Sequence, residues 1–210
     1  MGLAILILGL AIFIGTHVFV SLRAHRENLI ARIGEGPYKG VFSLVSILGV
    51  VLIVYGFSLY RRSGLIPVWS PPDFFRHVNE GLMWPAFVFV TAAYIPGYIK
   101  KALKHPMLAG VKLWAFAHLL SNGDLGGIVL FGSILGWAVY DRISLKRRAD
   151  AGARPGADAD LLPVPPVPRE AAVVGGGWKN DAVAVVVGTL VYLAVGLVFH
   201  PLAGVPVFVR

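Results

Sequence analysis

Six apolar segments, each close to the length of a membrane-spanning helix, constrain this chain more than any other feature of its sequence. Because a helix rises about 1.5 Å per residue, roughly 20 apolar residues cross the hydrocarbon core of a bilayer. Only 14% of the 210 residues are charged and 57% are hydrophobic, which leaves little room for a separate soluble domain. The sequence therefore predicts an all-α, polytopic integral membrane bundle of about six transmembrane helices, forming one domain over residues 1–210. The segments lie near residues 2–22, 39–60, 80–99, 105–121, 125–145 and 181–203.

Lysine and arginine gather in alternate connections between these segments. Fourteen of them follow the first, third and fifth segments, whereas four lie on the opposite side. Since basic loops are retained in the cytoplasm, we expect a multi-pass membrane protein with both termini facing away from the cytoplasm. The same bias explains the net charge of +8, so the expected partner is the lipid bilayer and not nucleic acid. The first segment lacks a basic leading region and is expected to be a retained span, not a cleaved signal peptide.

Two connections have a distinct composition. Residues 149–177 are rich in Ala, Pro and Gly without a helical period, which predicts a flexible cytoplasmic linker. Residues 64–75, GLIPVWSPPDFF, combine three prolines with Trp69, Phe74 and Phe75. We expect this segment to form an ordered interfacial loop at headgroup depth.

Ionisable residues inside the spans are the candidate functional groups, because each is costly in hydrocarbon and usually faces the interior of a bundle. His17 lies in the first segment, where Gly9 and Gly15 would permit close helix approach. His118 lies in the fourth segment, and these two histidines lie deeper than the other candidates. A neutral histidine that only hydrogen-bonds to a neighbouring helix remains the structural alternative for both.

The other intramembrane candidates lie nearer the ends of their segments. His105 precedes Pro106, so it could act as a helix cap or as a polar group of a site. Lys112 could extend to the cytoplasmic headgroups or bind an anionic ligand. His200 is expected to be interfacial.

Buried histidines without other strong ligands are typical of a haem site. The chain has no cysteine, which excludes thiolate ligands, iron–sulfur clusters and disulfides. Neutral imidazole binds haem iron, and facing helices can hold the macrocycle. The α-carbons of His17 and His118 should differ by about 10 Å in depth, so the pairings His17–His105 and His118–His200 would be more nearly level.

Two stretches resemble the NnrU family of bacterial membrane proteins, of which plant zeta-carotene isomerase is a more distant relative. They are THVFVSLRAHRENLIARIGEGPYKGVFSLVSILGVVLIVYGF and HPMLAGVKLWAFAHLLSNGDLGGIVLFG. The specific features are Gly-Glu-x-x-Tyr before the second segment, and His-Pro followed by Trp-x-x-x-His and Asn-Gly-Asp.

The resemblance implies a function and a set of ligands. Bacterial members are associated with denitrification and nitric oxide reductase activity, and the plant relative is similar to a haem b enzyme with histidine axial ligands. Carried across by motif, the metal ligands fall on His17 and His118, with His105 as a secondary polar group or alternate ligand. Lys112, with the arginines that follow the first segment, would face the haem propionates.

We therefore expect a protein that binds haem b and acts in nitrogen-oxide respiration, beside nitric oxide reductase or other respiratory membrane proteins. Whether it is an enzyme stays open. The alternatives are a haem-dependent carotenoid cis–trans isomerase and a non-catalytic membrane assembly factor for nitric oxide reductase. A small membrane methyltransferase would also open a helix with His-Pro, but the acidic and basic residues that would hold its cofactor do not follow here.

Overall fold

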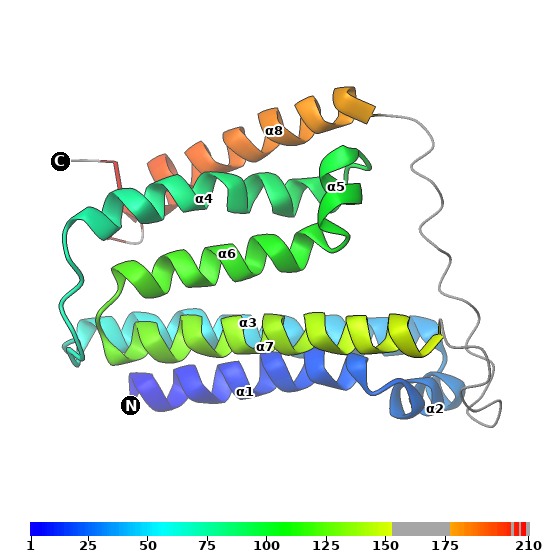
Figure 1. Cartoon of the computed structure of the whole chain (residues 1–210). Helices are drawn as coiled ribbons and strands as arrows, with labels where there is room; N and C mark the ends of the chain where they lie inside the picture. Colours follow the sequence, from blue (N-terminus) through cyan, green and yellow to red (C-terminus); the bar gives the residue numbers. More distant parts are fainter. Residues whose placement is uncertain (153–176, 203, 206, 209–210) are drawn as a thin grey trace. The chain divides into compact units, whose positions relative to one another are not determined.

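The computed structural model describes residues 1–152, 177–202, 204–205 and 207–208, and nearly all of these are helical (Figure 1). Over these residues there is no strand, only an isolated bridge between Pro67 and Asp124. The all-α class is confirmed. The elements are α1 (Gly2–Ser21), α2 (Arg23–Ile33), α3 (Glu35–Arg62), α4 (Phe74–Ala92), α5 (Tyr98–Leu103), α6 (Pro106–Ser121), α7 (Leu125–Gly152), α8 (Gly177–Ala194), the π-helical η1 (Val195–Phe199) and α9 (His200–Leu202).

Within the described part of the chain, four helices are long and apolar enough to cross a membrane by length and composition. They are Gly2–Ser21, Glu35–Arg62, Leu125–Arg147 and Gly177–Leu202. The polytopic membrane class agrees with this finding. Helices α4 and α6 match the third and fourth predicted segments but are not among these four, so the number of six spans stays a prediction.

Two predicted boundaries are wrong. The third segment was expected to run over 80–99, but α4 begins at Phe74 and ends at Ala92. Pro96 lacks an N–H and restricts the residue before it, so the chain breaks and restarts as α5. The linker was expected from residue 149, yet α7 continues to Gly152 through residues that include two alanines, the strongest helix former. The rest of the expected linker, 153–176, lies outside the described residues.

The chain divides into two compact units. The first contains residues 1–72 and 118–137, and the second contains residues 73–117 and the described residues from 138 onwards. The boundary falls within α6 and α7, so each of these helices contributes to both units. The single domain expected over residues 1–210 stays a prediction.

In the first unit, α1 packs along α3 through glycines (Figure 1). Gly2 and Gly9 are seven residues apart on α1, and Gly49 and Gly56 have the same spacing on α3, so each pair lies on one face. A Cβ atom added at Gly9 would lie 2.6 Å from the backbone nitrogen of Ile53. Glycine thus allows the two backbones to touch, as at many membrane helix crossings. The expectation of close helix approach is confirmed for Gly9 and is wrong for Gly15, where a Cβ would have no atom of the described residues within 4 Å.

In the second unit, α4 packs on α8, again with a glycine at the contact. A Cβ added at Gly188 would lie 2.7 Å from the Cα of Val88. Two hydrogen bonds also join the helices. The indole Nε1 of Trp84 donates to the hydroxyl of Thr189 at 2.9 Å, and the Tyr192 hydroxyl donates to the Glu80 carbonyl at 3.2 Å.

The break between α4 and α5 is held by side chains from the start of α8. The carboxylate of Asp181 accepts hydrogen bonds from the backbone nitrogens of Tyr98 and Ile99, both at 3.0 Å. The side-chain nitrogen of Asn180 donates to the Pro96 carbonyl at 2.7 Å. These bonds satisfy backbone groups that a broken helix leaves without intrahelical partners.

Gly9→Val should destabilise the protein, whereas Gly15→Val should be close to neutral. Overpacking of this kind lowers the free energy of unfolding by about 1–3 kcal/mol, and no atom lies within 4 Å of a Cβ built at Gly15. The measurement is thermal unfolding of the purified protein in detergent, followed by circular dichroism. Equal losses of stability for Gly9→Val and Gly15→Val would contradict the assigned contact of Gly9 with α3.

Candidate functional site

The imidazole of His17 is held in a defined orientation by its own helix. Its Nδ1 lies 2.8 Å from the backbone oxygen of Phe13, one turn earlier in α1. A carbonyl can only accept, so Nδ1 carries the proton, and in the neutral ring the lone pair is on Nε2. Histidines that bind metals show this arrangement, because a hydrogen bond from one ring nitrogen fixes the other for coordination.

Three aromatic rings surround this imidazole. The ring centroids of Phe13, Phe42 and Trp137 lie 4.2, 5.4 and 5.2 Å from that of His17. They come from α1, α3 and α7, so the cluster, here called the His17 cluster, draws on three helices of the first unit. The indole Nε1 of Trp137 is buried without a hydrogen-bond partner among the described residues. The cluster therefore combines apolar ring surfaces with a buried N–H donor and an imidazole nitrogen.

His118 also contacts α7, but at a different level and on a different face. Its ring stacks on Phe131 with centroids 4.4 Å apart. Phe131 precedes Trp137 by six residues, which corresponds to about 9 Å along the axis and about 120° around it. The structure thus brings both histidines to α7 and does not place one ring against the other. Shared ligation by His17 and His118 stays a prediction.

His105 and Lys112 belong to the second unit. Pro106 is the first residue of α6, and the backbone oxygen of His105 accepts from the Ala109 nitrogen at 3.1 Å, so His105 is at the N-cap position. Lys112 is half-buried in the middle of α6. The roles of both residues in cofactor binding stay predictions. In the part of the chain that the structure describes, there is no cluster of three His, Cys, Asp or Glu residues arranged for a metal ion.

The Asn-Gly-Asp sequence at residues 122–124 caps helices. The Asn122 side chain donates to the backbone oxygen of His118 at 2.8 Å, at the end of α6. The Asp124 carboxylate accepts from the Gly127 nitrogen at 2.8 Å, in the first turn of α7. The Asp124 bond satisfies a backbone N–H that the start of α7 leaves without an intrahelical partner. The His118 carbonyl also accepts from the Asn122 backbone nitrogen at 2.9 Å, so the Asn122 side chain adds a second bond there.

The same turn is joined to the loop that follows α3. The backbone oxygen of Gly123 accepts from the nitrogens of Val68 and Trp69, at 2.8 and 3.1 Å. The Leu125 nitrogen donates to the Ile66 oxygen at 2.9 Å. A side chain at residue 123 would collide with the Trp69 carbonyl, so glycine is required. The motif has a structural role that the sequence alone did not reveal, because its partners lie more than 50 residues away.

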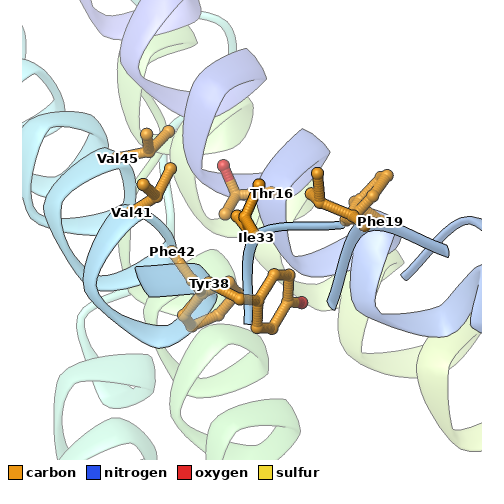
Figure 2. A pocket seen from close by; sticks show the side chains of 8 residues that line it. Thr16, Phe19, Ile33, Tyr38, Val41, Phe42 and Val45 are labelled. Carbon is orange, nitrogen blue, oxygen red and sulfur yellow. The ribbon is translucent and has the colours of Figure 1, made fainter. Parts of the chain in front are cut away.

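A cavity of about 280 Å³ adjoins the His17 cluster, where α1, α2 and α3 meet (Figure 2). Phe42 belongs to both, since its ring contacts the imidazole and lines the cavity. No motif in the sequence predicted this cavity, because its walls come from three separate segments. The lining residues are Thr16, Phe19, Leu29, Ile33, Tyr38, Val41, Phe42 and Val45.

The comparison with known families decides what this chain is. Residues 5–207 match the family model described as NnrU protein, and this match covers nearly the whole chain. The protein belongs to the NnrU family. No curated protein and no solved structure gives a significant match to it. For this NnrU protein the His-centred motifs therefore have to be interpreted from their own geometry.

Asp124→Ala should lower the free energy of unfolding by about 1 kcal/mol, because the first turn of α7 loses its side-chain cap. Asp73→Ala is the matched control, since Asp73 precedes α4 without a side-chain capping bond. The midpoints of thermal unfolding in detergent distinguish the two. A loss for Asp73→Ala as large as that for Asp124→Ala would contradict the capping role.

Proposed function

We propose that this NnrU protein binds haem b through His17 and acts in nitrogen-oxide respiration. The observation that supports this best is the orientation of the imidazole. The hydrogen bond to the Phe13 carbonyl fixes Nδ1 as the donor and leaves Nε2 as a ligand atom.

The residues around His17 fit one axial side of a haem. Phe13, Phe42 and Trp137 offer the apolar ring surfaces against which a macrocycle packs. In the proposal His118 is the second ligand, His105 is its alternate, and Lys112 pairs with a propionate. The offset of about 9 Å along α7 requires a tilted macrocycle for the pair His17–His118.

The protein's own groups would control the reactivity of such a site. The carbonyl of Phe13 increases the basicity of the His17 ring and strengthens its bond to a metal. The buried N–H of Trp137 is a donor that could hold a small polar ligand beside the imidazole. A bound haem would supply an iron that binds small ligands such as nitric oxide and changes its oxidation state.

His17→Ala should abolish the Soret band of protein purified from a haem-replete host, because it removes the oriented imidazole. His25→Ala is the control, since His25 is exposed on α2 eight residues later. The measurement is the reduced-minus-oxidised spectrum, together with the haem content per chain. His118→Ala tests the second ligand, and there we expect a shifted spectrum of one-histidine ligation instead of complete loss.

A colourless, folded wild-type protein would overturn the haem assignment and favour the assembly-factor alternative. Haem content retained in both His17→Ala and His118→Ala would overturn the ligand assignment alone. The respiratory role has a separate readout. Membranes of a denitrifying host without this protein should consume nitric oxide more slowly, and unchanged consumption would contradict that role.

We also propose that the protein lies in the bacterial inner membrane with both termini in the periplasm. The support is the distribution of Lys and Arg, fourteen residues on one side against four on the other. The connection at α2 is then cytoplasmic, and the loop after α3 is periplasmic.

Single cysteines test this orientation directly, because the chain has none of its own. Ser70→Cys should react with a membrane-impermeant maleimide in intact spheroplasts, whereas Ala24→Cys should react only after lysis. Both residues are exposed, so the difference reports the side of the membrane and not burial. The reverse pattern would overturn the proposed orientation.

A further inference from the structure

The cavity bounded by α1, α2 and α3 runs from the end of a membrane-spanning helix into its apolar part (Figure 2). Tyr38 is in the first turn of α3, and Val45 lies seven residues, or about 10 Å, further along the axis. The hydroxyl of Thr16 donates to the Ile12 carbonyl at 2.6 Å, so it is satisfied within its own helix. The walls are otherwise side chains of Phe, Leu, Ile and Val. A molecule in this cavity would have an apolar chain that begins near the membrane surface.

Two polar groups, one on the cavity wall and one beside it, have no hydrogen-bond partner in the described structure. Tyr38 lines the cavity with only 7% of its surface exposed, and its hydroxyl is buried without a hydrogen bond. The Nε of Arg26 is buried without one as well. The Arg26 guanidinium lies over the Tyr38 ring, 5.6 Å from its centroid. Unsatisfied buried donors are destabilising, so their presence side by side indicates an acceptor that binds there.

The charge of this segment favours an anion as that acceptor. A guanidinium offers only donors and stays protonated. The carboxylate of Glu35 forms an ion pair with Lys39 at 2.7 Å and also interacts electrostatically with Arg26, but no ion pair joins Arg26 to a carboxylate of the described residues. Arg23 and Arg32 add two further cations on the same short helix. Basic segments next to a membrane span attract anionic lipids.

We propose that the cavity binds one acyl chain of an anionic phospholipid, whose phosphate accepts hydrogen bonds from Arg26 and Tyr38. The apolar walls select a hydrocarbon chain, and the donors of Tyr38 on the wall and of Arg26 beside it select a negative headgroup. The site does not require haem, although it shares Phe42 with the His17 cluster.

The experiment is native mass spectrometry of the full-length protein with defined lipids, dioleoyl phosphatidylglycerol against dioleoyl phosphatidylcholine. We expect one phosphatidylglycerol to be retained at about tenfold lower lipid concentration than phosphatidylcholine. Arg26→Gln should remove this preference, and Tyr38→Phe should weaken it. Val45→Phe should displace the lipid by filling the cavity.

Two matched controls carry the same chemical changes elsewhere on α3. Tyr55→Phe alters an exposed tyrosine, and Arg62→Gln alters an exposed arginine that donates to the Ser58 carbonyl. Both should retain phosphatidylglycerol like the wild type. Arg26→Gln keeps the test valid if the core variant Val45→Phe fails to fold, because Arg26 lies on the short polar helix α2.

Four results would overturn the proposal. Equal retention of the two lipids would mean that lipid binds nonspecifically around the protein. The same conclusion would follow if the controls lost phosphatidylglycerol as much as Arg26→Gln does. Displacement of phosphatidylglycerol by inorganic phosphate at similar concentration would mean an anion site without a chain. Loss of the Soret band in Val45→Phe with unchanged lipid retention would assign the cavity to haem. Protein from haem-depleted cells should retain the lipid equally, which separates failure of this proposal from failure of the haem assignment.

Discussion

The glycine contacts between α1 and α3 determine how closely these two helices pack, and the His17 cluster and the cavity depend on this packing. Gly49 lies against Phe13, so that a Cβ at residue 49 would be 2.9 Å from the Cβ of Phe13. The carbonyl of this same Phe13 holds His17, and α3 carries Phe42 to the other side of the imidazole. The two backbones can touch only because their contact face carries hydrogen atoms in place of side chains. The orientation of His17 and the shape of the cavity therefore both depend on the glycines of the α1–α3 contact.

Polar side chains in these apolar helices mostly bond within their own helix. Thr16, Thr91 and Thr189 each donate to the carbonyl four residues earlier, and His17 does the same through Nδ1. This local bond satisfies the polar group without a partner from another helix. It therefore lowers the free-energy cost of placing that group in hydrocarbon. Four buried donors of the described residues have no hydrogen-bond partner, those of Arg26, Tyr38, Ser46 and Trp137. Trp137 belongs to the His17 cluster and Tyr38 lines the adjoining cavity, whereas Ser46 belongs to neither.

The sequence predicted those features that depend on short stretches of chain. The lengths and positions of α1, α3 and α8 follow from apolar runs, and the N-terminus of α6 follows from His105-Pro106. The end of α4 was not predicted, because the apolar run continues across Pro96 and hides the break. The sequence predicted that the α-carbons of His17 and His118 differ by about 10 Å in depth. Their contact residues on α7, Trp137 and Phe131, are roughly 9 Å apart along the helix axis. Both distances are calculated from the rise of the helix per residue. The aromatic cluster, the cavity and the backbone bonds of Gly123 and Leu125 to the loop after α3 were beyond the sequence, because their partners come from distant segments.

The hydrogen bonds from Asp181 to the start of α5 have a consequence for biosynthesis. The carboxylate follows its partner Tyr98 by 83 residues, and Thr189 follows Trp84 by 105. The glycine contact of α1 with α3 can form once residue 62 has left the ribosome, well before these partners exist. During translation the backbone groups at the Pro96 break and the indole N–H of Trp84 have no partner until α8 has been made. Until then they are solvated or held by the insertion machinery. The last long helix to be made thus completes contacts that the middle of the chain cannot satisfy alone.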